Sequence, residues 1–169
     1  MHFQKFKDSG VHLDGAVYNI AMDAYCKLEN MDEAVKLLIQ MMARGLAPDT
    51  IHYTCLINGY CLKGEIQSAL QVFERMLKEN IKPDLVTYNV LISGFFQRGL
   101  VTVVDDLLDH MIDQGLENSL TYGLAIDGFC RGGHLSKAEE IFSKVGKRLD
   151  NTEVLYNAYG SWLFAFRFH

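Results

Sequence analysis

The stretch TIHYTCLINGYCLKGEIQSALQVFERMLKENIKPD, residues 50–84, decides the fold because much of it recurs along the chain at an offset of 35 residues. The recurring residues are Tyr18, Tyr53 and Tyr88; Cys26 and Cys61; Ala34 and Ala69; Met41, Met76 and Met111; Pro48 and Pro83; and Asp49 and Asp84. A fixed period of this length is the signature of stacked helical hairpins. The sequence therefore predicts an all-α fold, an α-solenoid of stacked antiparallel helix-turn-helix repeats.

Two helices are predicted within residues 50–84. The apolar residues that recur at i, i+3, i+4 and i+7 are Tyr53, Leu56, Ile57 and Tyr60, followed by Ala69, Val72, Phe73 and Met76. Each set marks one apolar face of a helix. Gly64 separates the two helices because Gly allows the positive φ of a helix end, and Pro83 ends the second because it lacks an amide hydrogen. The first repeat departs from this pattern, with Glu29 at the place of Gly64.

The predicted repeats are residues 15–49, 50–84, 85–118 and 119–152, and the last two are shorter than the others. Residues 1–14 fit the tail of a preceding repeat, and residues 153–169 fit an incomplete repeat or an aberrant C-terminal tail. Because the chain starts inside a repeat, we expect it to be a fragment of a longer protein. An array of repeats needs polar end caps, so uncapped ends predict self-association.

The composition is that of a folded globular protein, with 49% hydrophobic and 22% charged residues. The formal net charge is −5, so a surface that attracts nucleic acid has to be a local one. No apolar run reaches the roughly 18 residues that a membrane span requires. We therefore expect no membrane partner.

Neither a metal site nor a disulfide is expected from the four cysteines. One place in the repeat holds Cys26, Cys61, Cys130 and, in the third repeat, Phe96. A place that accepts Phe is a packing position, where free Cys acts as a small hydrophobe; Cys55 stands alone at another place. The histidines share no spacing, and neither a His-x-Glu with paired cysteines nor a nuclease-like Asp cluster is present. We therefore expect no catalytic residue, no cofactor and no small-molecule substrate.

Two places in the repeat differ in polar chemistry from one repeat to the next. The residue after the recurrent Tyr is Asn19, Thr54, Asn89 or Gly123, and the last residue is Asp49, Asp84 or Asn118. If the first helices line one face of the stack, these side chains face one groove at regular intervals. Short donors and acceptors at such intervals suit the base edges of single-stranded RNA, with one base per repeat. The Asp residues also fit helix N-caps, so the two roles stay open.

Several segments resemble the pentatricopeptide repeat (PPR) family in its plain 35-residue form. They are Tyr18-Asn19, Tyr53-Thr54 and Tyr88-Asn89 near the repeat starts, Asp32-Glu33-Ala34 and Ile57-Asn58-Gly59-Tyr60-Cys61 within the repeats, and Ala47-Pro48-Asp49 and Lys82-Pro83-Asp84 at the repeat ends. The resemblance implies that the solenoid winds as a right-handed superhelix. It also implies a sequence-specific RNA-binding protein.

The resemblance implies one base for each repeat. Asn19 with Asp49 implies U, and Thr54 with Asp84 implies G. Asn89 implies a pyrimidine (Y) whether its partner is Asn118 or Ser119, and Gly123 implies no preference (N). The implied RNA is U-G-Y-N from 5′ to 3′ along the chain.

Two further sets of residues are expected to contact the RNA. The resemblance implies that the second residue of each repeat clamps the bases, and these residues are Ala16, Ile51, Val86 and Leu120. The candidate phosphate contacts, one or two residues after the recurrent Cys, are Lys27, Lys63, Arg98 and Arg131. A groove lined by these cations is basic although the whole chain is acidic.

The resemblance also implies where the protein acts. It points to a plant protein in organellar RNA processing, stability or translation, located in the mitochondrion or, as the alternative, the plastid. We expect no targeting segment within this chain. The alternative function is a protein-binding helical-repeat scaffold of the tetratricopeptide type. Such a groove needs apolar pockets that fit a peptide.

Overall fold

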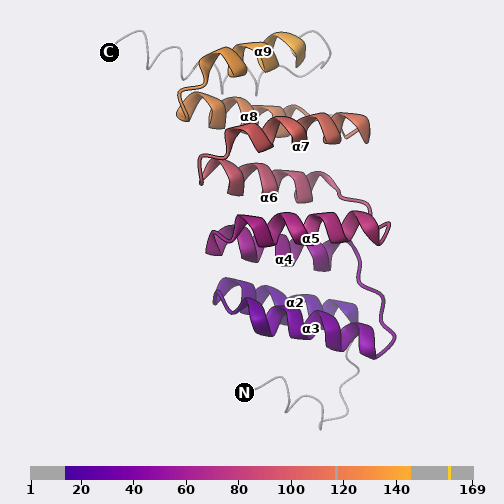
Figure 1. Ribbon diagram of the computed structural model, residues 1–169. Helices are drawn as coiled ribbons and strands as arrows, with labels where there is room; N and C mark the ends of the chain where they lie inside the picture. Colours follow the sequence, from indigo (N-terminus) through magenta and orange to yellow (C-terminus); the bar gives the residue numbers. More distant parts are fainter. Residues whose placement is uncertain (1–13, 117, 146–159, 161–169) are drawn as a thin grey trace. The chain divides into compact units, whose positions relative to one another are not determined.

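The computed structural model describes residues 14–116, 118–145 and 160, and within them the chain is built from α-helices without a strand (Figure 1). The helices are α2 (Gly15–Lys27), α3 (Met31–Ala43), α4 (Thr50–Lys63), α5 (Ile66–Lys78), α6 (Leu85–Phe96), α7 (Val101–Asp113), α8 (Ser119–Arg131) and α9 (Leu135–Val145). The all-α prediction is confirmed. The predictions for residues 1–13, for the end of the fourth repeat from residue 146, and for the tail at 153–169 except Gly160 lie outside the described residues.

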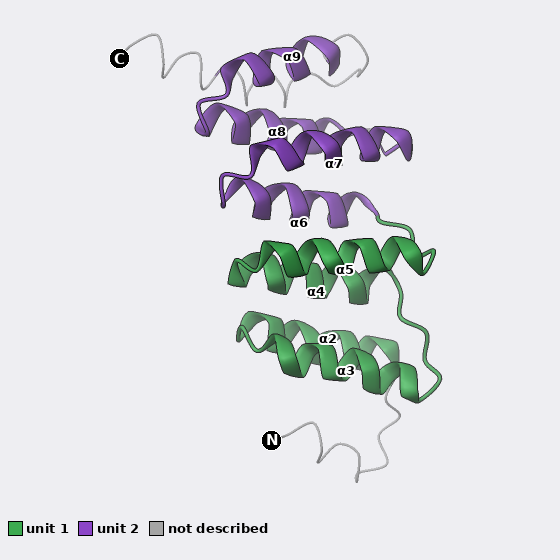
Figure 2. Ribbon diagram, in the orientation of Figure 1, with its two compact units in different colours: residues 1–83 green, residues 84–169 purple. Residues whose placement is uncertain are grey.

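The chain divides into two compact units, residues 1–83 and 84–169 (Figure 2). In the first unit α2 pairs with α3 and α4 pairs with α5; in the second, α6 pairs with α7 and α8 pairs with α9. The first helices of consecutive hairpins also pack on each other, α2 on α4 and α6 on α8. Each compact unit is therefore a stack of helical hairpins. No helix among the described residues is long and apolar enough to cross a membrane.

The recurrent apolar residues form the core, as the pattern predicts. Tyr53, Ile57, Ala69 and Met76 are fully buried, and the same holds for their counterparts Tyr18, Tyr88, Ala34, Ala138, Met41 and Met111. Cys26, Cys61 and Cys130 are buried and free, and the ring of Phe96 meets that of Phe129 edge-on at 5.1 Å. The interpretation of this place as a packing position is confirmed.

Cys55 does not stand alone in space. Its Sγ lies 3.9 Å from Sγ of Cys26, across the contact between α4 and α2. Both thiols are free in the structure. The repeat register gave no sign of this contact, because it compares equivalent places and not the different places that meet between neighbouring helices.

Glycine permits the close approach of successive first helices. A Cβ on Gly128 would lie 2.3 Å from the ring of Phe96, and one on Gly59 would lie 2.6 Å from Sγ of Cys26. Real Cβ atoms do not come so close to neighbours in packed interiors. Gly59 and Gly128 occupy the same place in their repeats, so this place sets the separation of α2 from α4 and of α6 from α8.

Each turn between paired helices contains one residue with positive φ. In three hairpins it is a glycine, as predicted, with φ of 81° at Gly64, 69° at Gly99 and 77° at Gly133. The first hairpin keeps the same turn although Glu29 replaces the glycine, and Glu29 has a φ of 57°. A left-handed conformation costs a residue with a Cβ about 1–2 kcal/mol, so the first turn is strained.

Glu29→Gly should stabilise the protein by about 1 kcal/mol, because it removes this strain. Chemical denaturation followed by circular dichroism measures the change in the free energy of unfolding. Asn80→Gly is the matched control: Asn80 also has a φ of 57°, but Asn tolerates this conformation better, so its gain should be smaller. A Glu29→Gly gain no larger than the Asn80→Gly gain would contradict the strain argument.

Candidate nucleic-acid interface

Every first helix in the described residues starts with a side chain that caps it. The N-cap residues are Asp14, Asp49, Asp84 and Asn118. Oδ1 of Asp49 accepts hydrogen bonds from the backbone N–H groups of Ile51 at 3.0 Å and His52 at 3.2 Å. The capping role that the sequence left open beside base contact is therefore present.

The cap geometry identifies the structural counterpart of Asp49 in the shortened third repeat. Asn118 caps α8, and its Oδ1 accepts from the backbone N–H of Leu120 at 2.7 Å, whereas Ser119 is the first residue of the helix. Three residues separate Gly45 from Asp49, but only two separate Gly115 from Asn118. The missing residue thus belongs to the loop before α8, and Asn118 takes the place of Asp49 and Asp84.

A cavity of about 360 Å³ opens in the first compact unit. It is lined by Gly15, Ala16, Asn19, Ile20, Met41, Leu46, Ala47, Asp49, Ile51 and His52. Its volume falls in the range of small-ligand pockets. Four residues that the sequence analysis assigned to the first base, two as polar contacts and two as clamps, are therefore brought together here.

Besides His52, the polar side chains that line this cavity are the amide of Asn19 and the carboxylate of Asp49. Oδ1 of Asn19 is buried and has no hydrogen-bond partner among the described residues. Buried acceptors are normally satisfied, so an open one is a candidate for a ligand donor. Beside it, Asp49 uses Oδ1 for its cap and makes no hydrogen bond through Oδ2 to a described residue, which leaves a second acceptor at the same cavity.

His52 holds Asp49 in place. Its Nδ1 lies 2.6 Å from Oδ1 of Asp49, and its Nε2 donates to the backbone carbonyl of Gly15 at 2.9 Å. Burial raises the pKa of Asp49, but the hydrogen bonds from His52 and from the backbone N–H of Ile51 outweigh it, so the pKa lies below its usual value. The carboxylate is therefore charged at neutral pH.

The predicted clamp residues share one environment. Ile51, Val86 and Leu120 are 58%, 59% and 56% exposed, and Ala16 is exposed as well. Large aliphatic side chains with this exposure at the same place in three repeats offer apolar surface to a flat ligand. Their contact with a base stays a prediction.

The polar pairs of the second and third repeats lie differently. Thr54 is half-buried on α4 in the first compact unit, while Asp84 caps α6 in the second. Asn89 lies on α6 and accepts a hydrogen bond at Oδ1 from Oγ1 of Thr121 at 2.8 Å. Gly123 is buried on α8 and brings no side chain to a ligand.

Three of the four candidate phosphate contacts are paired with acids. Lys27 bonds Asp23 at 2.7 Å, Lys63 bonds Glu65 at 2.6 Å, and Arg131 bonds Asp127 at 3.0 Å. The fourth, Arg98, is exposed, and no ion pair is recorded for it in the described part of the chain. Exposed ion pairs contribute only about 0–1 kcal/mol, so a phosphate can compete for these cations. The acids at Asp23 and Asp127, four residues before their partners, were visible in the sequence and were overlooked.

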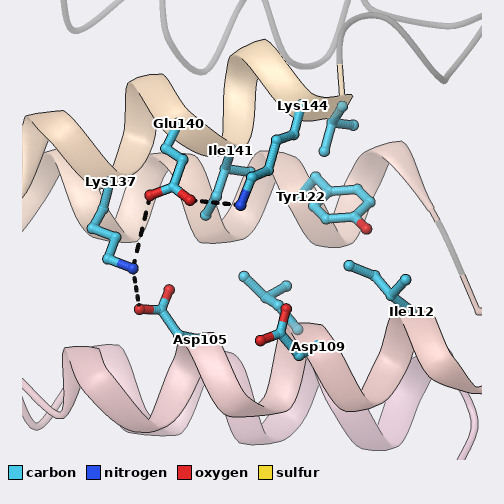
Figure 3. A pocket seen from close by; sticks show the side chains of 10 residues that line it. Asp105, Asp109, Ile112, Tyr122, Lys137, Glu140, Ile141 and Lys144 are labelled. Atoms are coloured by element: carbon cyan, nitrogen blue, oxygen red, sulfur yellow. Dashed lines mark hydrogen bonds and ion pairs between the residues drawn. The ribbon is translucent and has the colours of Figure 1, made fainter.

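A second cavity, of about 150 Å³, lies in the second compact unit between α7 and α9 (Figure 3). Lys137 bonds Asp105 at 2.6 Å and approaches Glu140 at 3.9 Å, and Lys144 bonds Glu140 at 2.5 Å. These charges satisfy one another and come from second helices, whereas the predicted base contacts lie on or just before first helices. We assign this cavity to packing between α7 and α9.

We compared the sequence of this chain with models of known protein families. The family model described as the PPR repeat family matches residues 14–61, 48–97 and 83–131, and the one described as the PPR repeat matches residues 120–148. The chain belongs to the pentatricopeptide repeat family. The PPR architecture thus extends over the hairpins that both compact units contain.

Solved PPR structures show the same fold. PPR10 from maize superposes with a TM-score of 0.80 at 27% identity, over 95% of this chain and 23% of that one. PPR10 in complex with an 18-nt psaJ RNA element gives 0.74 at 30% identity, over 82% and 21% of the two chains. The PPR domain of Arabidopsis thaliana protein-only RNase P 1 in complex with tRNA gives 0.69 at 15% identity, over 95% and 86%, which shows the fold alone. This PPR chain thus spans less than a quarter of the length of PPR10, and no curated protein matches its sequence.

Asp49→Ala should destabilise the protein by about 0.5–2 kcal/mol at neutral pH, because the N-cap of α4 is lost. Asp49→Asn is the matched control, since Asn caps as well as Asp. Because the pKa of Asp49 is lowered on folding, its charge stabilises the fold above the pKa of the unfolded chain, about 3.9, and this is lost as pH falls through the folded value.

The gap in thermal stability between the wild-type protein and Asp49→Ala should therefore narrow between about pH 5 and pH 3. Differential scanning calorimetry at a series of pH values measures it. A gap that widens as the pH falls would contradict the assigned hydrogen bonds.

Proposed function

We propose that this chain binds single-stranded RNA sequence-specifically, with one base per repeat. The observation that carries the proposal is the cavity in the first compact unit, which joins Asn19, Asp49, Ala16 and Ile51 in one site. The complex of PPR10 with an RNA element supports RNA as the ligand class for this family member. Binding, and no catalysis, is the proposed activity.

The chemistry of the cavity supports uracil as the first base. Uracil presents a donor, N3–H, at the centre of its Watson–Crick edge, and the open acceptor Oδ1 of Asn19 matches it. Cytosine has an acceptor at N3, so the centre of its edge offers the Asn19 oxygen no hydrogen. The exposed side chains of Ala16 and Ile51 line the same cavity and offer apolar contact to the base faces.

The proposed target is U-G-Y-N, and binding by this chain alone should be weak. A good bidentate base contact discriminates by about 1–3 kcal/mol, and three repeats carry a polar side chain for such a contact. Because ordering a flexible strand costs free energy, we expect micromolar affinity at low salt. A mitochondrial location, with the plastid as the alternative, and a role in RNA processing, stability or translation are part of the proposal.

Selection from a random RNA pool tests this function. The wild-type chain should enrich U-G-Y, and Thr54→Asn should move the second preference from G toward U by about tenfold in relative enrichment. Thr102→Asn, an exposed change on α7, is the matched control and should leave the enriched sequence unchanged. Two results would overturn the proposal and favour a protein-binding scaffold. One is a selected pool without a common sequence, and the other is a base preference at the second position that Thr54→Asn leaves unchanged.

A further inference from the structure

The third residue of each repeat forms a class of its own. These residues are Val17, His52, Thr87 and Thr121. His52, Thr87 and Thr121 are 3%, 0% and 0% exposed, and they are the buried polar side chains of the described part of the chain. Buried polar groups need hydrogen-bond partners, so the partners of these three show what the position does.

Each of the three bonds a side chain that the proposed function assigns to a base. Nδ1 of His52 bonds Oδ1 of Asp49 at 2.6 Å, and Oγ1 of Thr87 donates to Oδ1 of Asp84 at 2.9 Å. Oγ1 of Thr121 instead donates to Oδ1 of Asn89 at 2.8 Å. His52 and Thr87 thus bond the Asp that ends the preceding repeat. Thr121 follows a repeat that ends in Asn118, and it bonds Asn89 instead. An ionised carboxylate is the stronger acceptor, and Asn118 does not supply one.

We propose that Thr121 is a positioning residue that sets base specificity in the third repeat by fixing the amide of Asn89. The inference rests on the proposed function. With Oδ1 turned to Thr121, Asn89 has its two Nδ2 hydrogens left for a ligand, since no described residue bonds them. Because N3 of cytosine is an acceptor and N3 of uracil carries a hydrogen, an amide that presents a donor to N3 favours cytosine.

The first repeat provides the internal contrast. Asn19 occupies the same place as Asn89, but the third residue that follows it, His52, is bonded to Asp49 and Gly15. Oδ1 of Asn19 is consequently buried without a partner. The same amino acid therefore presents an acceptor in the first repeat and donors in the third, which divides the pyrimidine class: uracil first, cytosine third.

Thr121→Val tests this assignment because Val keeps the shape of Thr and removes only the hydroxyl. Two short RNAs that differ in cytosine or uracil at the third position compete for the protein in a fluorescence polarisation assay. The wild-type chain should prefer cytosine by about fivefold, the value of one hydrogen bond, and Thr121→Val should reduce the ratio to about one. Thr121→Ser, which keeps the hydroxyl, should restore the preference, and the matched control Thr102→Val should retain it.

The outcomes separate this inference from the proposed function. A preference for uracil in the wild type, an unchanged ratio in Thr121→Val, or an equal loss at the first and third positions overturns the positioning role while RNA recognition stands. Absence of any base preference in the wild-type chain overturns the proposed function and this inference with it. Thermal unfolding of each variant shows that the measured protein is folded.

Discussion

The structure depends on how each first helix begins. A helix start leaves backbone N–H groups without partners, and one short acidic or amide side chain accepts from one or two of them at each first helix of the described residues. At Asp49 the cap occupies Oδ1, and the ring of His52, in the first turn of α4, bonds the same atom. The requirement to cap the helix therefore fixes the orientation of the carboxylate, and only Oδ2 is left to meet a ligand. Helix capping and the proposed base contact therefore depend on one residue.

The regular spacing of the helices depends on the close contact between successive first helices. Gly59 and Gly128 lie where any Cβ would collide with Cys26 or with Phe96, so they keep the helix axes close. At this separation the start of α4 lies against the start of α2, where His52 bonds the carbonyl of Gly15, and Asn19 and Asp49 line one cavity there. The predicted recognition site thus belongs to pairs of neighbouring repeats and not to a single hairpin.

Much of this arrangement was predictable from the sequence because it follows from periodic positions. The buried faces of α4 and α5, the glycine turns and the caps all follow from the residue type at a fixed place. What the sequence did not reveal depends on pairs of unlike places that meet across a helix contact. The contact of Cys26 with Cys55 and the bond from Thr121 to Asn89 are of this kind. The third residue of the repeat was missed because Val, His and Thr share no obvious chemistry, and only the burial and the hydrogen bonds of His52, Thr87 and Thr121 show what these three have in common.

In the proposed complex, neighbouring repeats contact neighbouring bases through their first helices. Photo-cross-linking with 4-thiouridine at the first or the third position of a U-G-Y RNA measures this register, with the cross-linked peptides identified by mass spectrometry. The account predicts cross-links to α2 or the start of α4 from the first position and to α6 or the start of α8 from the third. Cross-links that stay on the same peptide when the label moves by two nucleotides, or that fall on α3, α5, α7 or α9, would contradict it.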